Sequence, residues 1–256
     1  MQSFKEQFQQ RINMNEQITF STLPILLQKF AETIPFENLR IIDRRQSLLS
    51  KEDLQQKILI QNEGGVCYEL NTLLYHYLKE CGFDVLLLSA CIYDQKSQQW
   101  SATGNTHAVI LLKMNSTAFI VDAGFGANIP LAPLPMSGEV ITTSNGQFRI
   151  KPAAEGYLME MKLEGNDSDW RIGYRFSSEE PITEISGLEQ MQQTIENHPA
   201  SPFNKSPLVT KRNEDGRYIL TAASFTEWHK GVSAKRTIDE EEFKELLDAI
   251  FGMQRS

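Results

Sequence analysis

The chain of 256 residues carries a net charge of −8, with 41% hydrophobic and 23% charged residues. These proportions are ordinary for a soluble globular protein, and the negative charge argues against nucleic acid as a partner. No apolar run approaches the ~18–20 residues that cross a membrane, and the first residues contain no apolar signal core. Three cysteines without Cys-x-x-Cys spacing cannot all pair, which favours reduced thiols, a cytoplasmic protein and no metal site.

Helical patterns fill residues 1–85. Thr22 can cap one helix and Ser50 a second, while a third begins at Cys67 and ends near Gly82, a residue suited to the left-handed position after a helix. Apolar residues recur at helical spacing on one face of each. They are Leu23, Leu26, Leu27 and Phe30 in the first helix, Leu54, Ile58 and Leu59 in the second, and Leu70, Leu73, Leu74, Tyr77 and Leu78 in the third. The segment 34–39 is expected to be a non-helical link.

Short strand patterns replace the helical ones from Val85. Strands are expected at 85–88, 108–113, 118–121, 147–150, 156–163 and 170–176, and a series of short strands predicts a β-barrel or curled sheet. A Pro-rich loop at 130–135 interrupts this series. After an irregular stretch at 197–203, strands at 208–212 and 218–222 and a helix from about Asp239 form a third unit. The sequence therefore predicts an α+β fold with domains 1–85, 86–195 and 196–256.

Cys67 directly follows Gly64-Gly65-Val66 and opens the third predicted helix. Unpaired N–H groups and the macrodipole in a first helical turn favour an anion, so this position favours the thiolate, the nucleophilic form of cysteine. The glycines would let a substrate approach the backbone closely. An ordinary buried thiol would also fit here, and the partners of Cys67 decide between the two interpretations.

His107 and Asp122 are the expected partners of Cys67, because a nucleophilic cysteine needs a base and a group that orients the base. His107, one of four histidines, begins a hairpin strand, and Asp122 ends the next strand. In an antiparallel hairpin the residue numbers of each facing pair add up to the same sum. If that sum is 229, Asp122 lies opposite His107. If it is 231, Asp122 lies two places away on the same face, still ~7–8 Å distant. The pair could be purely structural, but with Cys67 it forms a Cys–His–Asp triad.

The turn that follows Asp122, Ala123-Gly124-Phe125-Gly126, places an aromatic ring between two glycines. Backbone at such a turn can approach a ligand closely while the ring forms an apolar wall. A plain turn would explain the same glycines, and the position directly after Asp122 favours the ligand-binding interpretation.

Basic residues concentrate between Ser201 and Thr237. Seven Lys or Arg residues against three Asp or Glu residues give this segment a local charge of +4. The basic residues are Lys205, Lys211, Arg212, Arg217, Lys230, Lys235 and Arg236. The segment is either an ordinary solvated face or a surface for a small polyanion, for which local charge matters more than net charge.

Together these residues resemble the arylamine N-acetyltransferase family. The matching segments are 35–39 (Pro-Phe-Glu-Asn-Leu), 64–71 (Gly-Gly-Val-Cys-Tyr-Glu-Leu-Asn), 106–107 (Thr-His) and 121–126 (Val-Asp-Ala-Gly-Phe-Gly). Asn197-His198-Pro199, Ser201-Pro202-Phe203 and Asp215-Gly216-Arg217 follow in the family's order. The resemblance extends over nearly the whole chain.

The resemblance implies a helical N-terminal domain, a β-barrel second domain and an α/β C-terminal lid, the first two arranged as in cysteine proteases and transglutaminases. It implies ping-pong acetyl transfer from acetyl-CoA, without a metal, to arylamines, arylhydrazines or arylhydroxylamines. Cys67 would carry the acetyl group, with His107 as base and Asp122 orienting it. Phe36, Val66 and Phe125 would contact the acceptor, and Thr106, Gly124, Gly126, Trp228 and His229 the CoA. The protein is expected to be a monomer or homodimer, without nucleic acid or membrane as a partner.

Glu63 departs from the family, which usually has Arg ahead of the two glycines. In the family that Arg pairs with the Glu of the Pro-Phe-Glu-Asn segment, which is Glu37 here. Two carboxylates cannot pair in this way. Arg40, Arg44 or Arg45 are therefore expected to offset both of them.

Two other functions also fit these residues. A Cys–His–Asp thioester or amide hydrolase, or a transglutaminase-like enzyme, would use the same triad. A non-catalytic binding protein could keep the fold. Transfer to an aniline-type acceptor separates a transferase from a hydrolase, and an acetyl group on Cys67 separates an enzyme from a binding protein.

Overall fold

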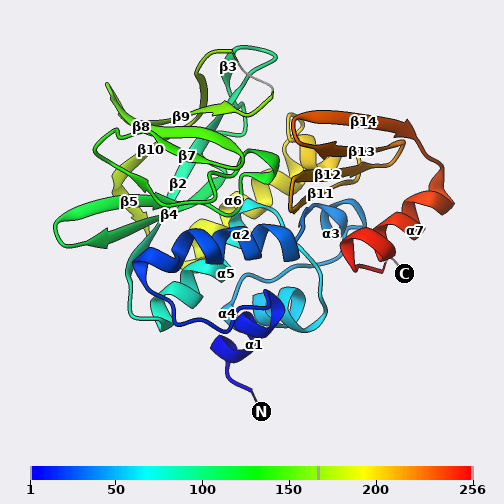
Figure 1. Cartoon of the computed structure of the whole chain (residues 1–256), viewed down its shortest axis with the longest axis horizontal. Helices are drawn as coiled ribbons and strands as arrows, with labels where there is room; N and C mark the ends of the chain where they lie inside the picture. Colours follow the sequence, from blue (N-terminus) through cyan, green and yellow to red (C-terminus); the bar gives the residue numbers. More distant parts are fainter. Residues whose placement is uncertain (1, 166–167, 255–256) are drawn as a thin grey trace.

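The computed structural model describes residues 2–165 and 168–254 and has the predicted α+β fold (Figure 1). Helices from the first part of the chain lie beneath a strongly curved sheet. A second, smaller sheet lies beside both and carries the C-terminal helix on its outer side. Among the described residues, no helix is both long and apolar enough to cross a membrane.

The helical part contains α1 (Phe4–Arg11), η1 (Phe20–Thr22), α2 (Leu23–Thr33), α3 (Leu39–Ile42), α4 (Lys51–Leu54), the π-helical turn η2 (Gln55–Ile60) and α5 (Cys67–Glu80). It includes the three predicted helices and adds α1, η1 and α3, the last of which begins at the end of the segment expected to be a non-helical link. Gly82, just beyond α5, has a φ of +86°, the left-handed conformation that favours glycine. Helix α1 was not predicted, although Ser3 caps it through a capping box with Glu6.

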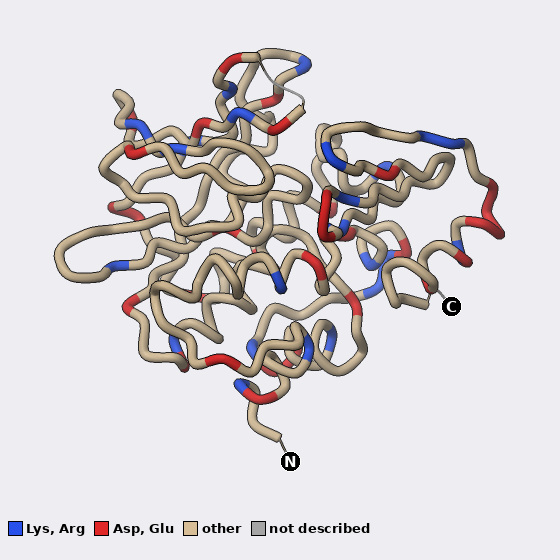
Figure 2. The backbone as a smooth tube through the Cα atoms, in the orientation of Figure 1, with Lys and Arg blue, Asp and Glu red and all other residues tan. Residues whose placement is uncertain are grey.

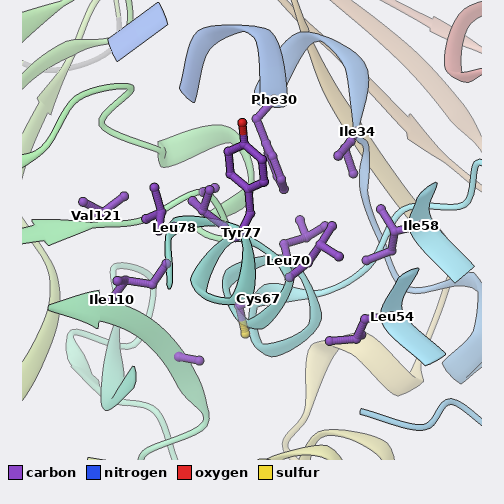
Figure 3. Close-up of a cluster of buried hydrophobic side chains, with 14 of the residues drawn as sticks. Phe30, Ile34, Leu54, Ile58, Cys67, Leu70, Tyr77, Leu78, Ile110 and Val121 are labelled. Carbon is purple, nitrogen blue, oxygen red and sulfur yellow. The ribbon is translucent and has the colours of Figure 1, made fainter. Parts of the chain in front are cut away.

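Helix α5 lies at the centre of the largest hydrophobic core (Figure 3). Phe30 of α2, Leu54 of α4 and Ile58 of η2 surround it, and Ile110 and Val121 from the curved sheet close the other side. Ten of the fourteen residues of α5 are buried, far more than the single apolar face that its sequence predicts. The helix that begins with Cys67 is therefore fixed by packing on nearly every side.

The curved sheet has the strand order β6-β5-β4-β2-β10-β9-β8-β7, with β3 paired to β2. Its strands are β2 (Asp84–Asp94), β3 (Gln99–Trp100), β4 (His107–Met114), β5 (Thr117–Val121), β6 (Leu134–Pro135), β7 (Ile141–Thr143), β8 (Gly146–Ala153), β9 (Gly156–Leu163) and β10 (Arg171–Ile182). Its curvature brings β6 against β8, so the sheet nearly closes into the predicted barrel.

The β4–β5 hairpin decides between the two predicted registers. Ile110 faces Val121 and Met114 faces Thr117, so facing residue numbers sum to 231. Asn115 and Ser116 form the two-residue turn with φ of 47° and 64°, as a type I′ hairpin turn requires. Asp122 therefore follows the end of β5 in a diagonal position relative to His107.

The smaller sheet has the order β1-β11-β12-β13-β14 and borrows its edge strand from the helical part. Its strands are β1 (Phe36–Glu37), β11 (Leu208–Asn213), β12 (Gly216–Thr221), β13 (Ser224–His229) and β14 (Val232–Thr237), and α7 (Glu240–Phe251) packs on it. Helix α6 (Ile185–Asn197) and η4 (Pro202–Asn204) lead into this lid. Helix α6 and strands β13 and β14 were not predicted. Because α6 continues through residue 195, the predicted domain boundaries remain predictions.

Candidate active site

Cys67 is the first residue of α5 and is 5% exposed. Val66 precedes it in extended conformation, and the Glu69 carboxylate accepts a hydrogen bond from the Val66 N–H at 3.1 Å. The Cys67 thiol donates to the Thr106 carbonyl oxygen at 3.5 Å, which links the helix start to the loop before β4. The sulfur therefore lies in the predicted first helical turn, directly beside the strand that begins with His107.

His107 and Asp122 form a buried hydrogen-bonded pair. His107 Nε2 lies 2.8 Å from Asp122 Oδ2, and the two residues are 2% and 0% exposed. Because Asp122 engages Nε2, the other ring nitrogen is left for Cys67. The predicted Cys–His–Asp arrangement is thus present in the structure.

Asn71, in the segment 64–71 but not among the predicted site residues, holds the Asp122 carboxylate. Its side-chain N–H groups donate to Asp122 Oδ1 at 2.8 Å and to the Ala108 carbonyl at 2.6 Å, and its Oδ1 accepts the Ala123 N–H at 2.9 Å. Gly124 N–H donates to the same Asp122 oxygen at 2.8 Å. Asn71 lies one helical turn after Cys67, and that i, i+4 spacing on a nucleophile helix was the sequence signal for it.

The electrostatics of the pair favour a charged imidazolium. Burial opposes the charge, but the Asp122 carboxylate and a hydrogen bond to Cys67 outweigh it and raise the pKa of His107 to about 10. Burial likewise acts against the charge of Asp122, whereas His107, Asn71 and Gly124 lower the pKa of this carboxyl. At neutral pH this geometry suits a proton held on His107 beside the sulfur.

A cavity of about 350 Å³ opens directly over Cys67 and His107. Aromatic side chains form much of its wall, with Phe36, Phe125 and Phe203 each contributing. A row of hydroxyl groups from Ser101, Thr103 and Thr106 lines it as well. The lid completes the cavity through Leu208, Thr210 and Ile219. The cavity therefore offers an apolar site for a small aromatic molecule next to the cysteine.

The structure gathers most of the predicted site residues around this cavity. Phe36, Phe125, Thr106, Gly124 and Gly126 line it together with Cys67 and His107. Gly124 is also packed so tightly that a Cβ atom there would lie 2.8 Å from the Cys67 Cα. Tyr174, not predicted as a site residue, packs its ring 5.0 Å from His107 and 5.3 Å from Phe125.

Three predicted contact residues lie outside the lining of the cavity. Val66 is 1% exposed and packs into the main core. Trp228 lies on the same face of the lid sheet as Ile219, where the Arg217 guanidinium lies 4.5 Å from its ring. His229 is on the opposite face, exposed, with Nδ1 3.5 Å from an Asp215 oxygen. Their roles in binding acceptor or CoA remain predictions.

Glu63 is held by the arginines that the sequence suggested, but Glu37 is not. Arg40 Nε lies 2.7 Å from Glu63 Oε2, and Arg45 Nη1 lies 3.3 Å from Glu63 Oε1. The cation within 4 Å of Glu37 in the described chain is Lys57, with Nζ 3.8 Å from Glu37 Oε1. The expectation that arginines offset both carboxylates is therefore corrected for Glu37.

The basic segment of the lid is less open than its sequence suggests. Arg212 and Arg217 are 5% and 9% exposed, and Lys211 donates to the Ile250 carbonyl of α7. Arg236 at the end of β14 pairs at 2.6 Å with Glu242 in the acidic first turn of α7. Figure 2 shows basic positions on β14 and acidic positions where α7 begins. Lys230 Nζ lies 3.8 Å from an Asp215 oxygen, which leaves Lys205 and Lys235 of the basic residues for a polyanion. Binding of a polyanion to this face stays a prediction.

A model of the N-acetyltransferase family matches residues 19–255 of the chain. The chain belongs to the arylamine N-acetyltransferase family. Its members are acyltransferases, so the predicted family and enzyme class are confirmed.

Known relatives agree in sequence and in fold. An uncharacterized acetyltransferase of Bacillus subtilis, YvcN, is 34% identical over 92% of each chain. Arylamine N-acetyltransferase C of Bacillus anthracis superposes with a TM-score of 0.93 at 35% identity, covering 99% of this chain and 100% of the other. The Bacillus cereus arylamine N-acetyltransferase NAT3 gives 0.93 at 36% identity over all of both chains and has a Cys-His-Glu triad. In this chain the carboxylate beside His107 is Asp122.

Proposed function

We propose that this protein transfers the acetyl group of acetyl-CoA to small aromatic amines or hydrazines, or to arylhydroxylamine oxygens, through an acetyl-Cys67 intermediate. One observation carries the proposal: Cys67 and the His107–Asp122 pair share a single cavity with Phe36, Phe125 and Phe203. A nucleophile, an oriented base and an aromatic acceptor site are the parts that such a transfer needs.

In the first half-reaction, the Cys67 sulfur attacks the carbonyl carbon of the acetyl thioester. The new sulfur–carbon bond forms as the bond from that carbon to the CoA sulfur breaks. His107 holds the proton that leaves Cys67 and gives it to the departing CoA sulfur. Because Asp122 and Cys67 raise the pKa of His107 to about 10 against the opposing effect of burial, the protonated ring is available at neutral pH.

In the second half-reaction, the acceptor occupies the space that the CoA sulfur has left. Its amine nitrogen attacks the acetyl carbon, the bond from Cys67 to that carbon breaks, and the amine proton returns through His107 to the sulfur. Phe36, Phe125 and Phe203 support an aromatic acceptor, since rings pack edge-to-face or offset against one another. The hydroxyl row of Ser101, Thr103 and Thr106 gives another part of the cavity lining a polar character.

The test compares transfer with hydrolysis. The protein is incubated with acetyl-CoA with and without an aniline-type acceptor, and free CoA, acetate and acetylated acceptor are quantified. We expect CoA release to accelerate with the acceptor and acetylated acceptor to exceed acetate. Acetate as the main product at saturating acceptor would instead support a thioester hydrolase.

Cysteine variants assign the activity to one thiol. Cys67→Ala should abolish both CoA release and acceptor acetylation. Cys91→Ala is the matched control, because Cys91 is also a buried free cysteine but lies on β2 outside the cavity lining. Loss of activity in Cys91→Ala together with full activity in Cys67→Ala would contradict the proposal.

A further inference from the structure

Lys57 is a buried cation between two buried carboxylates, next to the loop that carries Cys67. Its side chain is 4% exposed, and Nζ lies 2.5 Å from Glu69 Oε1 and 3.8 Å from Glu37 Oε1. Moving an ammonium group out of water is unfavourable unless opposite charges and hydrogen bonds offset the loss. The position of this lysine therefore needs both carboxylates, and both carboxylates need the lysine.

Glu69 connects Lys57 to the nucleophile. One of its oxygens accepts the Val66 N–H at 3.1 Å, and the other accepts the Ser47 hydroxyl at 2.6 Å as well as Lys57. Val66 is the residue directly before Cys67, so the carboxylate fixes the first turn of α5. Glu69 packs so closely against Gly65 that a side chain would not fit there, since a Cβ atom at position 65 would lie 2.9 Å from Glu69.

Glu37 connects Lys57 to the acceptor side of the cavity. Its Oε2 accepts the Leu39 N–H at 2.6 Å, and its own N–H donates to the Gly65 carbonyl at 3.0 Å. Its neighbour Phe36 lines the cavity. Burial raises the pKa of Glu37, and Lys57 counteracts that rise. The lysine thus stabilises the charged carboxylate that anchors the Phe36 strand.

The local backbone explains how a lysine reaches this place. Lys57 lies in η2, where the Gln61 N–H bonds to the Gln56 carbonyl five residues earlier. Lys57, Ile58 and Leu59, three successive residues of this turn, are all buried. The π-helical turn therefore directs the lysine inward beside two apolar residues.

Glu63 explains why the chain needs this lysine. The resemblance places an arginine at this position, where it would meet Glu37, but here the residue is an acid held by Arg40 and Arg45. The positive charge next to Glu37 comes instead from Lys57 of η2. In this chain Glu63 is therefore neutralised by Arg40 and Arg45, and Glu37 by Lys57.

We propose that Lys57 is a positioning residue for acetyl transfer: it holds Glu69 and Glu37 together so that Cys67 and Phe36 face the same cavity. The inference rests on the proposed function for the reaction it serves. The positioning of Cys67 itself is measurable without acetyl-CoA, because the thiol also reacts with alkylating agents.

The test compares Lys57→Met and Lys57→Arg with Lys51→Met. Lys51 is the matched control, since it also pairs with a glutamate, Glu80, but at the surface of α4. On folded protein well below its unfolding temperature, Lys57→Met should lower the rate of Cys67 alkylation by iodoacetamide and of Cys67 acetylation by acetyl-CoA at least about tenfold. It should also raise the acceptor KM. Lys57→Arg should recover most of both rates, and Lys51→Met should remain within about twofold of the wild type.

A second variant keeps the test decisive if Lys57→Met does not fold. Glu69→Gln keeps an oxygen for the Val66 N–H but loses the ion pair, so it should slow both reactions in the same direction. Lys57→Met or Glu69→Gln with a lower unfolding temperature but wild-type rates and acceptor KM would overturn the proposal, because the lysine would then be structural only. A wild type whose Cys67 alkylates normally but never acetylates would instead contradict the proposed function alone.

Discussion

The part of the molecule that holds Cys67, His107 and Asp122 differs from the lid in how completely it is buried. Cys67, His107 and Asp122 are 5%, 2% and 0% exposed and lie on elements that pack into the main core. The lid has a small core of its own around Val209 and Leu220, and every residue of β14 is exposed. The chemistry thus rests on a continuous packed core, whereas one wall of the cavity belongs to a separate unit.

The lid joins the rest of the molecule along β1, β11 and η4. Strand β1 pairs with β11, and Asn38 donates to the carbonyls of Phe203 and Ser206 at 2.7 and 2.9 Å. Its side-chain oxygen accepts the Leu208 N–H at 2.7 Å. Strand β11 also contacts α2 and η3, and Arg212 Nη1 of the lid donates to Asn145 Oδ1 at 2.7 Å. This difference implies that lid changes alter ligand binding, while core changes alter the reactivity of the thiol.

The largest effect is expected at Asp122. Asp122→Asn keeps the size of the side chain but removes the charge that orients and charges His107, so kcat/KM should fall by roughly 10³–10⁴-fold. Asp122→Glu keeps a carboxylate but adds a methylene to a fully buried site, so it should retain more activity than Asp122→Asn. Steady-state kinetics with acetyl-CoA and an arylamine check both. Equal activity of the two variants would show that the carboxylate charge is unimportant.

Leucine-to-alanine variants in the main core and in the lid core compare the two parts of the molecule by their effects on stability and on the reactivity of Cys67. Leu74 in α5 and Leu220 in β12 are both 0% exposed, and replacing either by alanine should destabilise its own core by about 2–5 kcal/mol. Leu74→Ala should also slow Cys67 alkylation, whereas Leu220→Ala should leave that rate unchanged and raise the KM for acetyl-CoA. Denaturant unfolding and alkylation rates are the measurements. Slower alkylation in Leu220→Ala would show that the lid is part of the reactive core.

Asn71→Ala should have a smaller effect. It removes a hydrogen bond to a charged, buried carboxylate, which costs about 1.5–3 kcal/mol of unfolding free energy. It should also lower kcat more than it raises either KM, because Asp122 loses a contact that fixes its position. The control is Gln193→Ala, on the exposed face of α6. Asn62 also lies outside this network, but its positive φ makes Asn62→Ala unsuitable as a control.

Stability should also depend on pH through His107. Burial disfavours its charge, but Asp122 and Cys67 raise its pKa in the folded state from 6.5 to about 10. The folded protein therefore holds this proton more tightly than the unfolded chain does. The resulting contribution to the free energy of unfolding is complete below about pH 6.5 and is lost as pH rises towards 10. The unfolding free energy of the wild type relative to His107→Gln should fall over that range, by no more than about 1.4 kcal/mol per pH unit. A difference that stays constant from pH 6.5 to 10 would contradict the charged pair.

The sequence was most informative where local rules decide the structure. The two glycines before Cys67 and Gly82 after the helix bounded α5, and the β4–β5 hairpin limited the His107–Asp122 offset to two registers. A two-residue turn then selected one of them. Such features depend on neighbours along the chain, and sequence patterns describe these well.

The sequence was less informative where distant segments meet. Lys57 and Asn71 have roles that depend on side chains far along the chain, and a polar residue in a helical pattern normally indicates a solvated face. The π-helical turn that faces Lys57 inward has no simple sequence signal. Strands β13 and β14 were missed because β14 is exposed on all its residues and lacks the alternation of a half-buried strand.

The central claim, that Cys67 carries the acetyl group, is tested most directly by mass spectrometry of the protein after brief incubation with acetyl-CoA. We expect one added acetyl group on the peptide that contains Cys67. It should be absent in Cys67→Ala and should be removed when an arylamine is added. An acetyl group that persists in Cys67→Ala, or one on Cys67 that an arylamine does not remove, would contradict the claim.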